Sequence, residues 1–240
     1  MANYKDIHGT HVETVSSDPS NPVNGQIWYN STTQTLKGFT QNPAGSWATG
    51  NAMNTGRYSV GATGTSTSAI AFGGRVSPPN AIIDNAETYN GSSWTEVADI
   101  STDRLAGRAL GGSSNAIMAG GEEPASPYAI YAQTESWNGS AWTEVGDLNA
   151  AGHVAGGAGD QSSGMIFGGS RPGRIALTED WNGTSWTEVA DLNVAANHLG
   201  GAGTTTAALS IGGVIPPDAS TGNVEDYTSP LDATVTFEVS

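Results

Sequence analysis

A tryptophan followed 26 residues later by a Gly-Gly pair occurs four times along this chain. The matching positions are Trp47 and Gly73, Trp94 and Gly120, Trp142 and Gly168, and Trp186 and Gly212. Self-similarity at a fixed period of about 45 residues is typical of one supersecondary unit copied side by side. The sequence therefore predicts a repeat protein, and a repeat constrains the fold more than composition does.

Each unit is predicted to supply four short strands separated by turns. A segment rich in glycine and alanine comes first, followed by a short apolar run that ends in the Gly pair. After a loop of variable length comes a glutamate with an aromatic residue two positions later, as in Glu87 and Tyr89. An Asn-Gly turn, as at Asn90-Gly91, then leads into the next tryptophan strand, because both turn residues tolerate positive φ.

The repeated small residues have a physical reason if their strand is innermost, where strands of all units crowd one axis. The Gly pairs would let backbone pass close to a neighbouring unit, and the aromatic residues would fill the wedge between sheets. These requirements are those of a β-propeller. We therefore interpret the following residues as structural repeat positions: Gly73, Gly74, Trp94, Gly120, Gly121, Trp142, Gly168, Gly169, Trp186, Gly212 and Gly213.

The order Gly-Gly, aromatic, tryptophan resembles the kelch repeat family. It is found in Gly73-Gly74…Tyr89…Trp94, in Gly120-Gly121…Trp137…Trp142 and in Gly168-Gly169…Trp181…Trp186. The resemblance covers residues 47–228 and implies an all-β, kelch-like β-propeller. The last copy departs from the pattern, because no tryptophan follows Tyr227, and we expect residues 232–240 to form its outer strand.

The N-terminal part differs from the repeats. Residues 1–24 are polar and are predicted to form an extended arm that attaches the protein to a partner. The segment Gly25-Gln26-Ile27-Trp28-Tyr29-Asn30, with Leu36-Lys37-Gly38 after it, resembles a hairpin of tailed-bacteriophage virion proteins over some 25 residues.

We predict a propeller over residues 25–240, with a partial blade at 25–49 and repeats at 50–99, 100–147, 148–191 and 192–240. Five blades are favoured, and four blades with an appended hairpin are the alternative.

Charge and composition exclude several partners. The formal net charge is −15, so the surface repels nucleic acid and anionic membranes. No stretch is long and apolar enough to insert into a membrane, and the first residues lack the apolar run of a signal peptide. There is no cysteine, which excludes disulfides, thiolate metal sites and the cysteine-linked tyrosine of copper-containing galactose oxidases.

We predict no catalytic residue, no metal site and no cofactor. The Gly-Ser-Ser-Trp type of segment is similar to the end of the sialidase aspartate box, but the aspartate is missing and the arginines are scattered. The pair His8 and His11 lacks further ligands, and His153 and His198 are interpreted as polar filler. Glu87, Glu135, Glu179 and Glu225 recur in every unit, so we interpret them as acceptors of hydrogen bonds from the adjacent blade, with Ca²⁺ binding as the alternative.

The loops after the Gly pairs carry the variation between units. They span residues 75–86, 122–134, 170–178 and 214–224, and insertions in repeat folds map to one face, which is commonly the binding face. Aromatic residues and arginines dominate binding hot spots. Our candidate contact residues are therefore Tyr128, Tyr131, Arg171 and Arg174.

The family resemblances imply a non-enzymatic structural protein of the bacteriophage virion, as a capsid decoration or a tail or fibre component. We expect it to be present in many copies or as a homo-oligomer. It would attach to other virion proteins through the N-terminal arm and present its loops to a host-surface glycan or protein. The alternatives are a cellular carbohydrate- or protein-binding kelch propeller and, third, a glycan hydrolase on the same scaffold.

Overall fold

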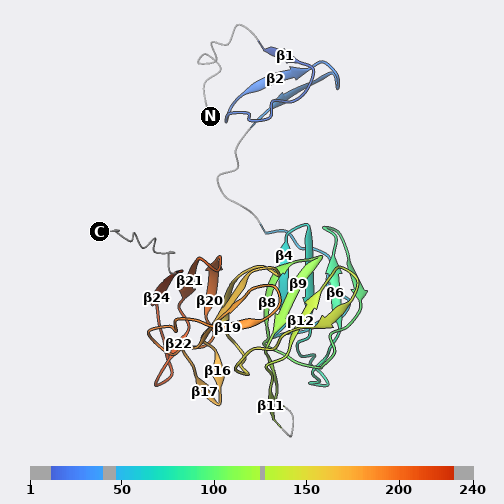
Figure 1. Ribbon diagram of the computed structural model, residues 1–240. Coiled ribbons are helices and arrows are strands. Elements are labelled where there is room, and N and C mark those ends of the chain that lie inside the picture. Colours follow the sequence, from blue (N-terminus) through green and yellow to red (C-terminus); the bar gives the residue numbers. More distant parts are fainter. Residues whose placement is uncertain (1–11, 40–46, 125–127, 230–240) are drawn as a thin grey trace, which may run out of the picture. The chain divides into compact units, whose positions relative to one another are not determined.

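The computed structural model describes residues 12–39, 47–124 and 128–229, and there every regular element is a β-strand (Figure 1). The prediction of an all-β protein is confirmed. The chain divides into two compact units, residues 1–49 and residues 50–240, which are described separately below.

The first unit contains a three-stranded sheet. Strand β1 (Glu13–Val15) pairs in parallel with β2 (Ile27–Asn30), and β2 pairs antiparallel with β3 (Thr35–Gly38). Of the segment predicted as an extended arm, residues 1–11 lie outside the described residues and residues 13–15 supply β1. The interpretation of residues 25–49 as a partial blade stays a prediction.

One carboxylate holds this small sheet together. Asp18 accepts hydrogen bonds from Trp28 Nε1 at 3.0 Å, from Asn30 Nδ2 at 2.8 Å and from Lys37 Nζ at 2.6 Å. The hydrogen bonds from Lys37, Asn30 and Trp28 favour the ionised carboxylate and lower the pKa of Asp18 to about 2. Asp18 thus ties the polar turn before β2 to both strands of the hairpin.

The second unit contains four successive sheets of three or four described strands, and the assignment of residues 50–99, 100–147, 148–191 and 192–240 to blades stays a prediction. Sheet 1 is β4 (Gly61–Thr65), β5 (Ser68–Phe72), β6 (Ala86–Tyr89) and β7 (Trp94–Val97). Sheet 2 is β8 (Arg108–Gly112), β9 (Asn115–Ala119), β12 (Thr134–Trp137) and β13 (Trp142–Glu144). Sheet 3 is β14 (Gly156–Gly159), β15 (Gly164–Phe167), β18 (Thr178–Trp181) and β19 (Trp186–Glu188). Sheet 4 has three described strands, β20 (Gly200–Gly203), β21 (Ala207–Ile211) and β24 (Val224–Thr228). The segment 232–240, predicted as its outer strand, lies outside the described residues.

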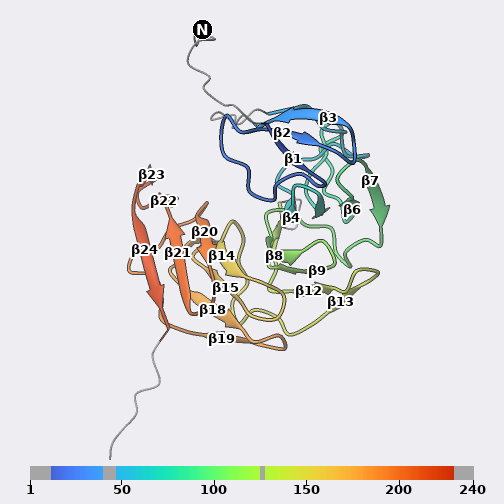
Figure 2. The same cartoon turned by 90° about the horizontal axis from the view of Figure 1, so that it is seen from above.

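The first strands of the four sheets lie next to one another in chain order. Strand β4 contacts β8, β8 contacts β14, and β14 contacts β20, while each later strand lies farther out (Figure 2). Residues of all four first strands line one central cavity, which includes Ala62, Arg108, Gly157 and Gly201. The glycine-rich strands are therefore the inner ones, where little room is left for side chains.

A backbone ladder joins the sheets near the start of the inner strands. The residue 12 positions after each tryptophan has a left-handed backbone: Ser59, Ala106, Val154 and His198. The amide of Ala106 donates to the carbonyl of Ser59, that of Val154 to Ala106, and that of His198 to Val154, at 2.9–3.0 Å. Each sheet is thus joined to the one before it through main-chain groups.

The Gly pairs form a second set of backbone contacts between sheets. All eight glycines have positive φ. A Cβ on Gly120 would lie 2.3 Å from the carbonyl oxygen of Gly152, which belongs to the next repeat, and the amide of Gly121 donates to the same oxygen at 2.8 Å. Gly73-Gly74 and Gly168-Gly169 make the corresponding approaches to Arg104 and Ala196. Only glycine can adopt the positive φ at these positions and also fit in the space, which leaves no room for a Cβ.

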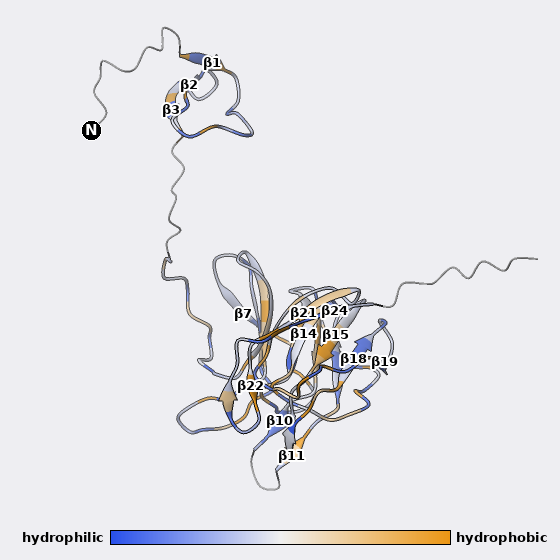
Figure 3. Cartoon of the chain, turned by 90° about the vertical axis from the view of Figure 1, so that its left-hand side faces the viewer, coloured by the Kyte–Doolittle hydropathy of each residue, from blue (hydrophilic) through white to orange (hydrophobic). Residues whose placement is uncertain are grey.

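The apolar residues of neighbouring sheets pack into three cores, one at each junction. Between sheets 1 and 2, the ring of Trp142 meets that of Phe72 edge-on at 4.7 Å. Between sheets 2 and 3, Trp186 packs with the buried core residues and its Nε1 donates to Thr134 Oγ1 at 3.0 Å. In Figure 3 the second unit carries hydrophobic colour on β15, whose four residues are all buried. Trp142 and Trp186 thus seal sheets 2 and 3, respectively, against the preceding sheet.

Replacing Gly120 with valine tests the close approach of the sheets. The branched side chain has no room beside the Gly152 carbonyl, and the left-handed φ adds strain, so we expect the free energy of unfolding to fall by about 3 kcal/mol or more. Gly212→Val is the matched control for strain, because its Cβ would meet nothing closer than 3.4 Å, and Gly173→Val is the control for open space. Urea unfolding should rank the losses Gly120 > Gly212 > Gly173, and equal losses at Gly120 and Gly173 would contradict the interpretation.

The pH dependence of the first unit tests the role of Asp18. Because its pKa in the folded sheet is lowered, the contribution of Asp18 to stability is fully present above pH 4 and is lost as pH falls toward 2. The indole N–H resonance of Trp28 should titrate with a midpoint near 2, and this transition should vanish in Asp18→Asn. A midpoint at the ordinary aspartate value of 3.8 would show that the three donors do not hold this carboxylate.

Candidate functional site

Small hairpins follow three of the Gly pairs. They are β10 (Glu122–Glu123) with β11 (Ala129–Ile130), β16 (Ser170–Arg171) with β17 (Gly173–Arg174), and β22 (Val214–Ile215) with β23 (Ala219–Ser220). In sheet 1 the corresponding loop makes single bridges from Arg75 to Tyr58 and to Ile82. The labelled hairpin strands lie at the same end of the sheets in Figure 1. We call this surface, formed by residues 75–84, 122–124, 128–131, 170–175 and 214–221, the loop face.

The structure brings Tyr128 and Tyr131 together on the hairpin of sheet 2. The hydroxyl of Tyr128 donates to Glu122 Oε2 at 2.9 Å, and that of Tyr131 donates to Glu123 Oε2 at 3.2 Å. Partial burial and these hydrogen bonds to carboxylates raise the pKa of both phenols. Tyr128 remains 54% exposed, so its ring is available to a partner while its hydroxyl is held in place.

Arg171 and Arg174 lie together on the hairpin of sheet 3, but in different environments. Arg171 is exposed, whereas the guanidinium of Arg174 forms an ion pair with Asp218 in the hairpin of sheet 4. Arg174 therefore links two neighbouring hairpins, and Arg171 is the freer of the two for external contact.

A further link joins the hairpins of sheets 2 and 3. Nδ1 of His153 lies 3.3 Å from Glu122 Oε1, and the backbone of His153 pairs with Ser170. Together with the pair of Arg174 and Asp218, this contact makes the loop face one connected surface over sheets 2, 3 and 4.

Apart from His153, which was interpreted as polar filler, sequence reasoning missed the position 11 residues after each tryptophan. It is Tyr58, Leu105, His153 and Asn197 in the four repeats, and each residue pairs through its backbone with a residue just after the Gly pair. The backbone position of these four residues is the same in each repeat, but the residue type differs. A fixed position with a variable side chain is a signal for a binding surface that can be read from the sequence. Asp218 could not be found in this way, because the lengths of the loops differ between repeats.

The repeated glutamates serve the crossing segments that lead from one sheet to the next. Glu179 accepts hydrogen bonds from the backbone amides of Asn149 and Ala150 at 2.8 and 3.0 Å. Glu135 accepts one from the Ser101 amide at 2.9 Å and one from Arg104 Nη2 at 2.8 Å. The prediction that these donors belong to the adjacent blade was wrong. They belong to the same repeat, because the chain passes this carboxylate on its way from an outer strand to the next inner strand.

Two of the four glutamates also neutralise a buried arginine. Glu87 pairs with Arg57 at 2.6 Å and Glu135 with Arg104 at 2.8 Å, and all four side chains are almost completely buried. Burial lowers the pKa of Arg104, and the charge of Glu135 opposes that shift. Repeats 3 and 4 have Gly152 and Ala196 at the arginine position, and there Asn149 and Asn193 donate to the carboxylate instead.

In the described part of the chain, the acidic side chains and the histidines are spread out. No group of three or more histidine, aspartate and glutamate side chains there could hold a metal ion. The pKa of Asp103 is raised by burial and by the negative charges of Asp84 and Glu123, so these three carboxylates repel one another. The central cavity is lined mainly by small residues, with Arg108 bonded to the Gly157 carbonyl at 3.0 Å. The arrangement can present side chains to a partner.

Comparison with protein families found no matching family model, and comparison with curated proteins found no match. Among the residues that the structure describes, no helix could cross a membrane.

Replacing the repeated glutamates tests the difference between repeats 1 and 2, where the glutamate pairs with an arginine, and repeats 3 and 4, where an asparagine donates to it. Glu135→Gln leaves the buried guanidinium of Arg104 without a counter-charge, and we expect a loss of about 3–5 kcal/mol in the free energy of unfolding. Glu179→Gln keeps one amide acceptor and faces no arginine, so about 1–2 kcal/mol should be lost. Urea denaturation of the two variants gives the comparison, and equal losses would show that the ion pair is not what distinguishes them.

Proposed function

We propose that this chain is a non-enzymatic structural protein of a bacteriophage particle, a capsid decoration or a tail or fibre component. In this proposal the four sheets are blades of a kelch-like β-propeller, the N-terminal arm of residues 1–24 attaches it to other virion proteins, and the loop face contacts the host surface. Multiple copies on one particle would add avidity, so each contact can be weak. The observation that supports the binding role is that the variable hairpins of sheets 2, 3 and 4 form one connected surface, the loop face.

The geometry of the second unit supports presentation of a surface. Its sheets are joined by backbone hydrogen bonds and three apolar cores, which leaves the hairpins as the part that varies between repeats. The exposed ring of Tyr128 and the exposed guanidinium of Arg171 lie on adjacent, linked hairpins. An aromatic ring and an arginine on one connected surface suit a glycan or a protein surface.

The assignment to a phage particle is supported by the resemblance of residues 25–47 to a virion hairpin. In the structure, this segment contains β2 and β3, and Asp18 fixes it to the preceding turn. A small sheet that forms within a unit of its own suits an attachment module.

Purified particles test the proposal. Mass spectrometry should detect the chain in particles at several copies, and detection only in cell extract would contradict the virion assignment. In particles carrying Tyr128→Ala with Arg171→Ala, incorporation should be unchanged and adsorption to host cells should fall by about 10-fold. Ser66→Ala, an exposed change at the opposite end of the sheets, is the matched control and should leave adsorption unchanged. Normal adsorption of the double variant would remove the loop face from the proposed function.

A further inference from the structure

Arg108 breaks the repeat pattern of the inner strands. It lies 14 residues after Trp94, and at this position the other three repeats have a glycine: Gly61, Gly156 and Gly200. In sheets 1 and 3 the residue on the paired strand is a phenylalanine, whose ring would lie 2.5 Å from a Cβ on Gly61 and 2.4 Å from one on Gly156. In sheet 2 the paired residue is Ala119, which leaves room for a side chain. Room explains why a side chain is tolerated here, but it does not explain a positive charge.

The guanidinium of Arg108 has no carboxylate partner in the described part of the chain. It is partly buried, its Nη2 donates to the carbonyl oxygen of Gly157 at 3.0 Å, and its Nε is enclosed without a partner. Glu179 lines a narrow cavity together with Arg108, but its carboxylate is already held by two backbone amides. Burial lowers the pKa of Arg108 and of Arg104, and at Arg104 the charge of Glu135 opposes the shift. A charge taken out of water without a counter-charge is costly, so an anion at Arg108 would be stabilising.

Arg108 lies where two cavities among the inner strands meet. The central cavity described above has a volume of about 250 Å³, and a second cavity of about 420 Å³ shares Ala62, Arg108 and Ala109 with it. The second cavity is lined by the residues of the backbone ladder, Ser59, Ala106, Val154 and His198. Each of these directly follows a residue that pairs with the start of a loop after a Gly pair, so this cavity lies toward the loop face. Ligand pockets of proteins begin at about 300 Å³, and the second cavity therefore has room for a small molecule.

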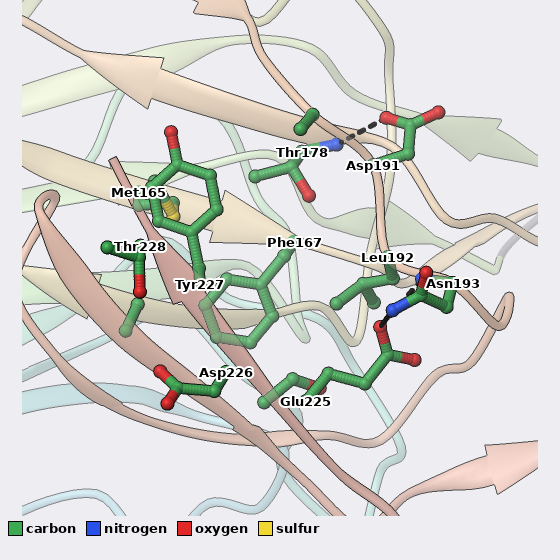
Figure 4. A pocket seen from close by; sticks show the side chains of 13 residues that line it. Met165, Phe167, Thr178, Asp191, Leu192, Asn193, Glu225, Asp226, Tyr227 and Thr228 are labelled. Atoms are coloured by element: carbon green, nitrogen blue, oxygen red, sulfur yellow. Dashed lines mark hydrogen bonds between the residues drawn. The ribbon is translucent and has the colours of Figure 1, made fainter. Parts of the chain in front are cut away.

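The lining of these two cavities favours an anion. Arg108 and His198 are the ionisable residues in it, and no aspartate or glutamate lines either cavity, although the chain has 23 acidic residues. The cavity between sheets 3 and 4 has the opposite character, because Asp191, Glu225 and Asp226 line it (Figure 4). An anion is therefore repelled there and attracted beside Arg108.

We propose that Arg108 and the cavity of about 420 Å³ form a binding site for a small carboxylate. One cation matches one negative charge, and the planar guanidinium suits the two oxygens of a carboxylate. The net charge of −15 disfavours anions of higher charge, such as phosphate. Two sources share this chemistry, a free organic acid and the uronic acid of a glycan. The site does not include Tyr128 or Arg171, so it goes beyond the function proposed for the loop face.

Titration of the full-length protein with sodium acetate, sodium glucuronate and glucose at constant ionic strength tests the site. The Nε–H resonance of Arg108 and the amide resonance of Gly157 should shift saturably with both carboxylates and stay unchanged with glucose. In Arg108→Gln, the shift of the Gly157 amide should need a concentration about 10-fold or more higher, because a charge-assisted hydrogen bond is lost. Lys5→Gln removes the same charge from the first unit and is the matched control, which should bind like the wild type.

The same titrations distinguish the two sources. Tighter binding of glucuronate than of acetate would assign the site to an acidic sugar, and the reverse would assign it to a free organic acid. Urea unfolding without added carboxylate checks the fold of Arg108→Gln, which should be at least as stable as the wild type because an uncompensated charge is removed.

Three results would overturn the proposal. They are the absence of a saturable shift of the wild-type Arg108 resonance with either carboxylate, an unchanged affinity in Arg108→Gln, and an equal loss of affinity in Lys5→Gln. The first of these does not depend on whether the Arg108 variant folds. None of them concerns adsorption through Tyr128 and Arg171, so failure of this proposal and failure of the proposed function are separate outcomes.

Discussion

The structure of the second unit depends on main-chain contacts between successive sheets. At each of the first three Gly pairs, the second amide donates to a carbonyl of the following repeat, as Gly121 does to Gly152, and the first glycine lies against that same backbone. A side chain at Gly120 would separate the two sheets and open the core behind them. Trp142 packs at the junction of sheets 1 and 2, and the Gly pair that follows it, Gly168-Gly169, contacts Ala196 of the fourth repeat.

These contacts explain how one scaffold can carry different loops. The Glu179 type of carboxylate fixes each crossing segment. Of the residues between the Gly pair and the glutamate, those next to the glutamate, such as Ala86 and Thr134, are buried, and those farther away, such as Tyr128 and Arg171, are exposed. Their hairpins differ in length and chemistry and meet through contacts such as Arg174 with Asp218. The repeated carboxylates of this frame are already engaged by backbone amides of the crossing segments.

Much of this architecture could be predicted from the sequence because it repeats. The strands of each sheet, the turns at Asn138-Gly139 and the inner position of the glycine-rich strands follow from spacing and residue size. Pairwise contacts could not be predicted, whether they recur in every repeat or occur once. The donors to Glu135 were assigned to the wrong segment, because spacing does not show the path of a crossing chain. Asp18 in the first unit gave no repeat signal at all, and neither did Asp218 on the loop face.

The most direct measurement of the central claim is native-state hydrogen exchange of the Gly74, Gly121 and Gly169 amides in increasing urea. If the sheets are held together as one body through these contacts, the three amides should exchange with one common free energy, equal to that of unfolding residues 50–240. Exchange at three separate, lower free energies would show that the sheets open independently, and the account of a single rigid frame would be wrong.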